Sequence, residues 1–585
     1  MKKTASTIIL SLVTFFCYAA DSDELRKSKM LSDLDIIKNS FEVKYAPSEW
    51  KRTYAQWDLN TQIENAKSQI LSTPKITVKD YQKILRTFFN STRDYHVAIN
   101  FYSTSAAFLP FRIKSAAGRY FIISVDHKST DVPIAKGDEL LEFNGRPIQA
   151  VMDDLKKLEQ GNPESLTDQA KAEILLTERI GAHGNDVPSG EVSIAVKHQG
   201  SKKKSTYKLE WMTVDEEIKN DKVYKGFTAA AVKMAANIPR DDKSFLKHPF
   251  LHKSMRAGFY KPVKDAVKKY EMAQTRDPDD DFFVDPLGSK KSFIPYLGQL
   301  LWQNPDQSNF HAYIYMSPGQ KRIGYIRISD YEGGAAGAAN AAQEFAELIA
   351  KFQRDTDALV IDQIYNPGGE VFYMYALASM LTNKPFDLPT HRETITQEDV
   401  LYALNNLKNF KKFRAAKKQD ENISGYPITP ELVESISSHL TFVIDEWNAG
   451  RTFTNPGYLY GIQKLQPHQR VNFTKPLLIL VNEMAFSCGD FLPAILQDNK
   501  RATIFGTQTA GAGGYVIEQT HPNLFGIQEY TFTASVAERL DKKPIENLGV
   551  TPDIIYNLTT DDLQNNYVGY MNAVNSAVDG LFKKK

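Results

Sequence analysis

The chain is 585 residues long, which exceeds what one hydrophobic core organises, so about two to four domains are expected. Its share of hydrophobic residues (42%) and of charged residues (24%) is that of an ordinary soluble protein. Because 71 basic residues stand against 70 acidic ones, no overall field attracts nucleic acid or anionic lipid. We therefore expect no nucleic-acid partner, and any partner must be recognised by a local site.

The N-terminal segment, residues 1–20, has the parts of a secretory signal peptide. Two lysines come first, an apolar core runs from Ile8 to Phe16, and small residues follow at Ala19 and Ala20. The core is too short to span a membrane comfortably, so we expect cleavage and no stable membrane anchor. The protein is predicted to be exported, and its destination is the periplasm, the cell exterior or a host cell.

Residues 21–105 have a helical rhythm, in the segments LSDLDIIKNSFEVKYAP, WDLNTQIENAKSQILS and TVKDYQKILRTFF. Thr77 and Asp80 offer a capping signal for the last of these helices. The region ends in STRDYHVAINF, which places His96 after a helix and at the entry to an extended run. We expect an N-terminal helical region that carries this histidine.

Residues 106–200 are rich in predicted strands, and IAKGDELLEFNGRPI (134–148) resembles the core of a PDZ domain. Such domains capture an extended peptide by adding it as a strand to a sheet edge. Asn144 and Gly145 favour a type I′ hairpin turn whatever the domain does, so ligand binding by this module stays open.

Residues 201–291 contain scattered lysines and the acidic run DPDDDFF (277–283), without clean alternation, and are predicted to be a linker or a separate insert. From residue 292 to 585, strands and helices alternate: KRIGYIRISDY, then the alanine-rich helix 338–354, then DALVIDQIYNPGG and the helix EVFYMYALASML. Strands separated by helices predict a parallel-rich sheet covered by helices, with functional groups on the turns at strand ends.

Ser487 lies between the buried strand 477–481 and a helix that includes residues 491–496. A serine there can act as a nucleophile, because the first amides of a helix, such as those of Ser487 and Cys488, can face an oxyanion. The alternative is an ordinary N-cap, with Asp490 stabilising the first turn. For a lone serine the cap is the commoner case, so a catalytic role needs support from other segments. Cys488 itself is taken as a small packing residue.

Two further segments offer that support. The turn NPGG (366–369) allows close approach of the backbone, so an amide of Gly368 or Gly369 can supply a second oxyanion donor, unless the turn is only structural. Glu546, in KPIENLGVTPDI (543–554), is either a catalytic carboxylate or a solvated surface acid.

Four segments in order resemble the S41 family of serine endopeptidases, the tail-specific or C-terminal processing type: RIGYIRISDY, DQIYNPGG, LVNEMAFSCGD with QDNKRATIFGTQTAGAGG, and PIENLGVTPDI. The PDZ-like segment lies upstream, as in that family. The resemblance implies an α/β multidomain protein with a crotonase-like (ClpP/crotonase) catalytic domain. It also implies hydrolysis of peptide bonds in protein or peptide substrates.

One position departs from the Ser-Lys branch of the family, because Ala512 stands where that branch has a general-base lysine. The chain instead resembles a His-Ser-Glu branch. That resemblance implies His96, in TRDYH, as the base, Ser487, in FSCGD, as the nucleophile, and Glu546, in IENLGV, as the residue that orients the histidine. Spacing alone does not choose His96 over His521, which is nearer in sequence to the serine.

The same branch implies a homodimer and a zymogen activated by self-cleavage of an internal segment, which corresponds here to about residues 222–289. No H-E-x-x-H, paired C-x-x-C or Walker-type loop is present, so neither a metal nor another cofactor is expected. Two alternatives remain. The missing lysine favours a catalytically inactive peptide-binding protein, and the crotonase fold also hosts acyl-thioester chemistry.

Overall fold

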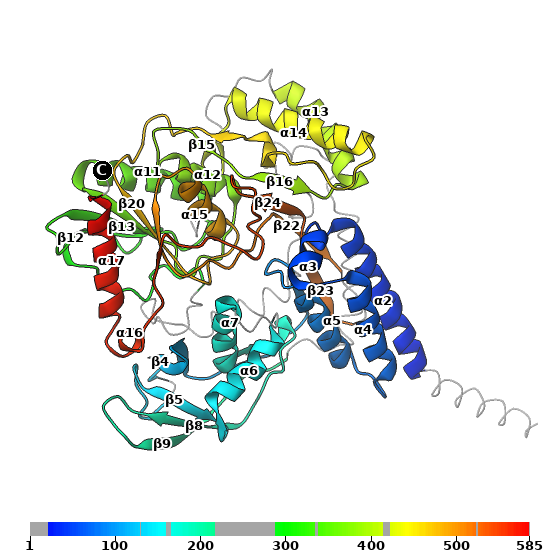
Figure 1. Ribbon diagram of the computed structural model, residues 1–585. Coiled ribbons are helices and arrows are strands. Elements are labelled where there is room, and N and C mark those ends of the chain that lie inside the picture. The colour runs from blue at the N-terminus through cyan, green and yellow to red at the C-terminus, as the bar shows by residue number, and fades with distance from the viewer. Residues whose placement is uncertain are drawn as a thin grey trace, which may run out of the picture.

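The computed structural model describes residues 22–128, 130–159, 165–216, 287–333, 337–413, 422–521 and 525–583. The predicted signal peptide, and most of the predicted linker and inhibitory segment, lie outside these ranges. Figure 1 shows the N-terminal helices at one side, the PDZ-like module below and the α/β part above. The expected α/β multidomain fold, with an N-terminal helical region, is confirmed.

The N-terminal region is built of four helices. They are α2 (Ser22–Lys44), α3 (Ser48–Ala55), α4 (Leu59–Ser72) and α5 (Val78–Ser91). Helix α5 begins with the expected capping box, in which Thr77 and Asp80 each bond the other's backbone. The helices do not form a closed unit, because Phe532 and its neighbours on a C-terminal strand share their core.

That strand belongs to a small antiparallel sheet that joins the two ends of the chain. Its strands are β1 (Ile99–Phe101), β22 (Val516–Thr520) and β23 (Ile527–Thr533), in the order β1-β23-β22. In Figure 1, β22 and β23 lie against the N-terminal helices. Since β1 begins three residues after His96, this pairing carries the loop with the histidine onto the C-terminal half of the chain.

The PDZ-like module is a sheet in the order β3-β4-β5-β8-β9, with β6 on β5, covered by helices α6 and α7. Its elements are β3 (Phe111–Ala116), β4 (Arg119–Val125), β5 (Glu139–Phe143), β6 (Arg146–Pro147), α6 (Ile148–Leu158), α7 (Leu166–Thr177), β8 (Glu191–Lys197) and β9 (Lys204–Glu210). Asn144 and Gly145 have φ of 48° and 71°, as the predicted type I′ turn requires.

The predicted start of the linker at residue 201 is wrong. Strand β9 pairs along its whole length with β8. A second small sheet is made of β2 (Ala106–Phe108), β7 (Glu178–Ile180), which precedes the short helix η1 (Gly181–His183), and β10 (Met212–Val214). The alternation in KSTYKLE was too polar to indicate a strand, because one face of β9 is exposed.

The C-terminal half is organised by a seven-stranded sheet in the order β11-β12-β13-β14-β20-β21-β25, parallel from β13 onward. The strands are β11 (Gln299–Gln303), β12 (His311–Met316), β13 (Arg322–Arg327), β14 (Ala358–Asp362), β20 (Leu477–Val481), β21 (Thr503–Gly506) and β25 (Ile554–Ile555). The central strands β14 and β20 are buried on both faces, which explains their continuous apolar runs.

Helices cover both faces of this sheet. One core contains side chains of α11 (Ala338–Asp355), α12 (Val371–Ser379) and α15 (Cys488–Asp498). The other contains α17 (Val568–Leu581). Neighbouring residues of β14 alternate between the two cores, Ile361 in the first and Val360 in the second.

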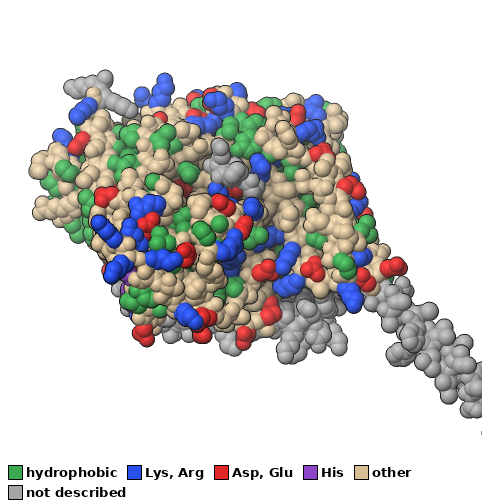
Figure 2. Space-filling model, turned by 60° about the horizontal axis from the view of Figure 1, so that its bottom comes forward, with side chains coloured by type: hydrophobic (Ala, Val, Ile, Leu, Met, Phe, Trp, Pro, Cys, Tyr) green, Lys and Arg blue, Asp and Glu red, His purple; other side chains and the backbone are tan. Residues whose placement is uncertain are grey.

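The remaining elements surround this layer structure. They are β15 (Phe386–Asp387), β16 (Thr390–Glu393), α13 (Gln397–Phe413), β17 (Asn422–Ile423), β18 (Tyr426–Pro427), α14 (Pro430–Asn448), η3 (Leu459–Gly461), β19 (Lys464–Leu465), β24 (Ser535–Glu538) and α16 (Thr560–Gln564). On the face in Figure 2, basic and acidic side chains are interspersed, as the near-equal charge count leads one to expect.

Candidate active site

Ser487 lies on the sharp turn between β20 and α15, at the N-cap position of the helix. Its backbone has φ 54° and ψ −119°, and its side chain makes no capping hydrogen bond. The interpretation of Ser487 as an ordinary N-cap is therefore wrong. A non-glycine residue in such a conformation costs about 1–3 kcal/mol, and strain of this kind concentrates at functional sites. Among the described residues the half-buried hydroxyl has no hydrogen-bond partner, so it is available for another role.

The first amides of α15 surround this serine. Gly489 N–H donates to Phe486 O (2.7 Å) and Asp490 N–H donates to Ser487 O (2.7 Å). Within the described part of the chain, Cys488 N–H has no acceptor, as expected for an oxyanion donor. The Cys488 thiol donates to Gly369 O (3.2 Å), and burial raises its pKa well above the ordinary value. The thiol is therefore a packing group rather than a nucleophile.

The turn at 366–369 packs directly on Ser487. A methyl group added at Gly368, whose φ is 93°, would lie 2.6 Å from the Ser487 Cβ. Asn366 ties the two turns together, since its carbonyl accepts from Phe486 N–H (2.9 Å) and its Oδ1 accepts from Gly368 N–H (2.8 Å). In this conformation Gly368 N–H is already engaged. Gly369 N–H has no acceptor among the described residues and is the freer candidate on this turn.

His96 lies in the loop between α5 and β1. Its N–H donates to Asp94 Oδ1 (2.9 Å) and its carbonyl accepts from Thr531 Oγ1 (2.6 Å), so the backbone is fixed on both sides. The ring is enclosed, yet neither Nδ1 nor Nε2 has a hydrogen-bond partner in the described structure. Burial lowers the pKa of His96, against the opposing charge of Asp94. The imidazole is therefore neutral and able to accept a proton.

Glu546 is completely buried, so its interpretation as a solvated surface acid is wrong. Its Oε1 accepts from Lys51 Nζ and its Oε2 from Gly513 N–H (3.1 Å). Burial raises the pKa of Glu546 to about 8, although both hydrogen bonds favour the carboxylate. A buried carboxylate held by two donors is a typical feature of functional sites rather than of surfaces.

The segments that carry the three candidates converge, but no hydrogen bond among described residues joins His96 to Ser487 or to Glu546. The rings of Tyr95 and Phe486, neighbours of His96 and Ser487, meet edge to face with centroids 5.7 Å apart. Asn547, next to Glu546, donates to Arg93 O in the histidine loop (2.6 Å). Catalytic hydrogen bonds are often long or unformed before substrate binds.

The loop 509–514 is hydrogen-bonded to the first turn of α15, next to the serine. Asp490 accepts from Thr509 Oγ1 (2.5 Å), Gly511 N–H (2.9 Å) and Ala512 N–H (3.0 Å). Ala512 is fully buried, so a lysine has no room at this position without rearrangement. The absence of the Ser-Lys branch's base therefore agrees with the packing.

The competing histidine, His521, is already committed elsewhere. Its Nε2 lies 2.6 Å from Asp33 Oδ1 on α2, and Asp33 also accepts from Tyr81 (2.7 Å). This arrangement fastens the β22–β23 turn to the N-terminal helices. His96 is left as the better placed of the two candidates.

Two residues were missed from sequence. Lys51 on α3 contacts Glu546 although it is about 500 positions away, and Asn366 joins the two turns around the serine. A lysine on a short polar helix gives no sign that it is buried, so no sequence signal identifies Lys51. Asn366 stands within the NPGG motif, but its bonds depend on tertiary contacts.

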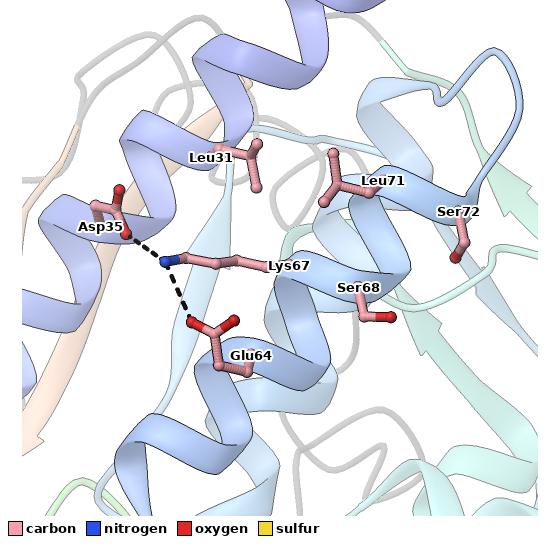
Figure 3. Close-up of a pocket in the computed structure, with 7 residues that line it drawn as sticks. All are labelled: Leu31, Asp35, Glu64, Lys67, Ser68, Leu71 and Ser72. Atoms are coloured by element: carbon pink, nitrogen blue, oxygen red, sulfur yellow. Dashed lines mark ion pairs between the residues drawn. The ribbon is translucent and has the colours of Figure 1, made fainter.

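A cavity of about 330 Å³ opens beside the site. Its lining includes Tyr95 and Val97, which flank the candidate base, and Phe486, which precedes Ser487. A larger shallow groove, about 630 Å³, lies between α2 and α4 and is shown in Figure 3. There Lys67 is paired with Asp35 (3.1 Å) and Glu64 (3.4 Å), and none of the groove's lining residues belongs to the candidate site.

Among the described residues, no group of three or more His, Cys, Asp or Glu side chains is placed to hold a metal ion. Among the helices that the structure describes, none is both long and apolar enough to cross a membrane.

Comparison with known proteins identifies the family of the chain. The sequence profile of a PDZ domain matches residues 105–218, and that of peptidase family S41 matches residues 322–556. A protein of Chlamydia pneumoniae is 34% identical over 603 residues, which covers 99% of this chain and 94% of that protein. An uncharacterized protein of Chlamydia muridarum is 33% identical, covering 96% and 94%.

The solved structure of mature CPAF in complex with lactacystin superposes with a TM-score of 0.80 at 29% identity, over 96% of this chain and all of that one. The motifs TRDYH, FSCGD and IENLGV resemble those of this protein, the chlamydial protease-like activity factor, within the His-Ser-Glu branch. The similarity of fold confirms the resemblance. The chain is a serine-type peptidase and belongs to peptidase family S41.

Proposed function

We propose that this protein is an exported serine endopeptidase that hydrolyses protein substrates through Ser487, His96 and Glu546. The observation that carries the proposal is the backbone of Ser487. Its positive φ, its free hydroxyl and its place at the first turn of α15 suit a nucleophile and serve no capping purpose.

The chemistry follows from general principles. His96 takes the proton of the Ser487 hydroxyl as the oxygen attacks the peptide carbonyl carbon, and Glu546 stabilises the imidazolium. The tetrahedral intermediate collapses, the C–N bond breaks, and His96 gives its proton to the leaving amine. Water then attacks the acyl-enzyme with His96 again as base, which releases the acid product and regenerates the serine.

The oxyanion is assigned to two amides, one from each of the turns that meet at the serine. Cys488 N–H comes from the helix, where the macrodipole adds a favourable field, and Gly369 N–H comes from the facing turn. Gly368 contributes its N–H only if that group leaves Asn366 when substrate binds. Its absent side chain already serves the site by leaving room for Ser487.

The cavity beside Tyr95 and Phe486 supports a peptide substrate, since a side chain next to the scissile bond needs a recess of this kind. The PDZ-like module supports recognition of an extended peptide segment. Lactacystin is bound in the solved structure of mature CPAF. The same compound is therefore a useful probe of the site proposed here.

Export, self-cleavage and dimerisation belong to the same proposal. The N-terminal sequence supports removal of residues 1–20 and delivery to the periplasm, the medium or a host cell. The solved CPAF structure is that of the mature protein, which supports processing of this chain as well. That the processed part is an internal segment between the PDZ-like and catalytic parts is proposed from the family resemblance. A homodimer is proposed from the family resemblance alone.

The test is cleavage of unfolded casein by the wild type, Ser487→Ala and His96→Ala, all without residues 1–20. We expect each variant to lose activity by about ten-thousandfold, the usual cost of removing a triad member. Ser576→Ala, an exposed serine on α17, is the matched control and should cut as the wild type does.

Each other outcome is informative. Activity retained in His96→Ala but lost in Ser487→Ala would show that the base is misassigned, and His521→Ala would be measured next. A wild type that neither cuts casein nor reacts with a fluorophosphonate at Ser487 would support the inactive peptide-binding alternative. A single band after prolonged incubation of active protein would count against self-cleavage.

A further inference from the structure

Lys51 is a completely buried lysine whose ammonium is fully satisfied. Its Nζ donates to Glu546 Oε1, to Asn547 Oδ1 (2.7 Å) and to Arg93 O (2.8 Å). Three acceptors match the three N–H groups of an ammonium, so Lys51 is protonated and has no lone pair for a substrate proton. It is therefore no replacement for the missing general-base lysine.

The contact between Lys51 and Glu546 is supported by further hydrogen bonds from neighbouring side chains. Trp50, the residue before Lys51, donates to Asn547 Oδ1 (3.1 Å), and Asn547 in turn donates to Arg93 O (2.6 Å). Helix α3, the turn with Glu546 and the loop with His96 thus meet at one hydrogen-bonded point. A buried charge is costly to keep unless its partners are held this firmly.

We propose that Lys51 is a positioning residue for the peptidase reaction, one that holds the Glu546 carboxyl group in place beside the loop of His96 and favours its ionised form. The inference rests on the proposed triad and goes beyond it, because it assigns a role to an element outside the catalytic domain. The N-terminal helical region then completes the active site rather than merely covering it.

The charges of Asp94 and Lys51 act in opposite directions on both groups. Burial raises the pKa of Glu546, and the charge of Asp94 raises it further, whereas Lys51 opposes both. Burial lowers the pKa of His96, Asp94 opposes this, and Lys51 lowers it further. Tyr45, the other titratable side chain at this point, donates to Asp94 Oδ2 (3.0 Å). Lys51 therefore favours the ionised carboxylate and the neutral imidazole together, which are the states that the reaction starts from.

The experiment compares Lys51→Met with the wild type in steady-state cleavage across pH, on the full chain without residues 1–20. Without the cation the pKa of Glu546 rises, so kcat at pH 7.5 should fall by up to about tenfold, while KM changes by less than about threefold. The rise of kcat on the acid side of the pH profile, its acid limb, should move up by about one pH unit. The loss of kcat relative to the wild type should therefore be smaller at pH 9.5. A merely structural role would lower activity without moving the limb.

Two further variants act as controls. Arg52→Met changes the adjacent exposed cation on α3 and should leave the profile unchanged. Lys51→Arg keeps the positive charge and should return the acid limb to its wild-type position, even where its larger head lowers kcat.

A double-mutant comparison decides whether Lys51 acts through Glu546. In the Glu546→Gln background, adding Lys51→Met should cost less than about twofold, because the carboxylate it serves is gone. An equal loss in both backgrounds would overturn the proposal. If Lys51→Met alone fails to fold, the double variant, which leaves no unpaired carboxylate, is compared with Glu546→Gln alone. A loss below about twofold then supports the proposal, and a loss of about tenfold contradicts it. Wild-type activity in Glu546→Gln alone would instead refute the triad.

Discussion

At the scale of single residues, the site depends on two groups whose burial changes their charge states. Glu546 has no exposed surface, and burial raises its pKa to about 8. His96 is enclosed with both ring nitrogens free, and burial lowers its pKa. A neutral glutamic acid cannot stabilise an imidazolium, so the two ionisations limit the reaction at different pH values.

The pH profile of kcat/KM follows from this difference. In the wild type, activity should rise as pH passes through about 8, where Glu546 loses its proton. In Glu546→Gln the maximum value of kcat/KM should fall. The pH at which kcat/KM rises should shift below 6.5, the ordinary pKa of histidine, because the ionisation of His96 alone then controls it. The measurement is initial rate on a fluorogenic peptide between pH 5 and 10, each pH checked for intact fold.

If kcat/KM rises at the same pH in the wild type and in Glu546→Gln, this assignment is contradicted, because a group other than Glu546 then sets the lower pH boundary. A limb below pH 6.5 in the wild type would show that Glu546 is already ionised there.

The candidate triad was accessible from sequence because each member lies in a short local motif, FSCGD, TRDYH or IENLGV. Those motifs could not give the charge states, which arise from burial among distant segments. Lys51 shows the limit most clearly. Its partners, Arg93, Glu546 and Asn547, are spread over two other segments, and no periodicity of the helix SEWKRTYA indicates that its lysine points inward.

At the scale of elements, the PDZ-like module is bonded to the segment that leads into the nucleophile. Lys114 on β3 lies 2.6 Å from Glu483 Oε1 and 3.3 Å from Glu173 Oε2 on α7. Thr167 on α7 donates to Glu483 O (2.7 Å). Although burial acts to raise it, Lys114 and Thr507 hold the pKa of Glu483 below its usual range. The module is therefore fixed four residues before Ser487.

Lys114→Met should lower the free energy of unfolding by about 3–5 kcal/mol, because it leaves two buried carboxylates without their cation. Urea unfolding monitored by tryptophan fluorescence measures the loss. Lys204→Met, which breaks an exposed pair with Glu142 on the same module, is the control and should change stability by less than about 1 kcal/mol. Equal effects of the two substitutions would argue that the Lys114 cluster does not bear on stability.

Element boundaries were predictable where strong periodicity and turn chemistry coincide, as in the capping box of α5 and the Asn144–Gly145 hairpin. The prediction of a boundary was wrong at β9, where lysines and a glutamate on the exposed face obscure the alternation of polar and apolar residues. Pairing with β8 makes this segment a strand, and pairing partners are not visible in a local pattern.

At the scale of the whole molecule, the first and last parts of the chain share one core. Phe41 of α2 meets Phe532 of β23 with ring centroids 4.8 Å apart, and Phe89 of α5 meets Tyr530 at 5.4 Å. The sequence divides these segments into a helical region and a catalytic domain, because composition changes between them. The packing joins them, and the histidine loop is held where the two meet.

Phe532→Ala tests this joint core. Removing a fully buried phenylalanine should cost about 3–5 kcal/mol, and the amides of α2 and α5 should exchange faster with deuterium, although the substitution lies on β23. Hydrogen exchange read by mass spectrometry locates the effect. Ile36→Ala, an exposed position on α2, is the control and should leave exchange unchanged. Unaltered exchange in α2 and α5, with protection lost only around the catalytic sheet, would mean that the N-terminal helices fold independently. Their hold on the histidine loop would then be a docking contact rather than part of one core.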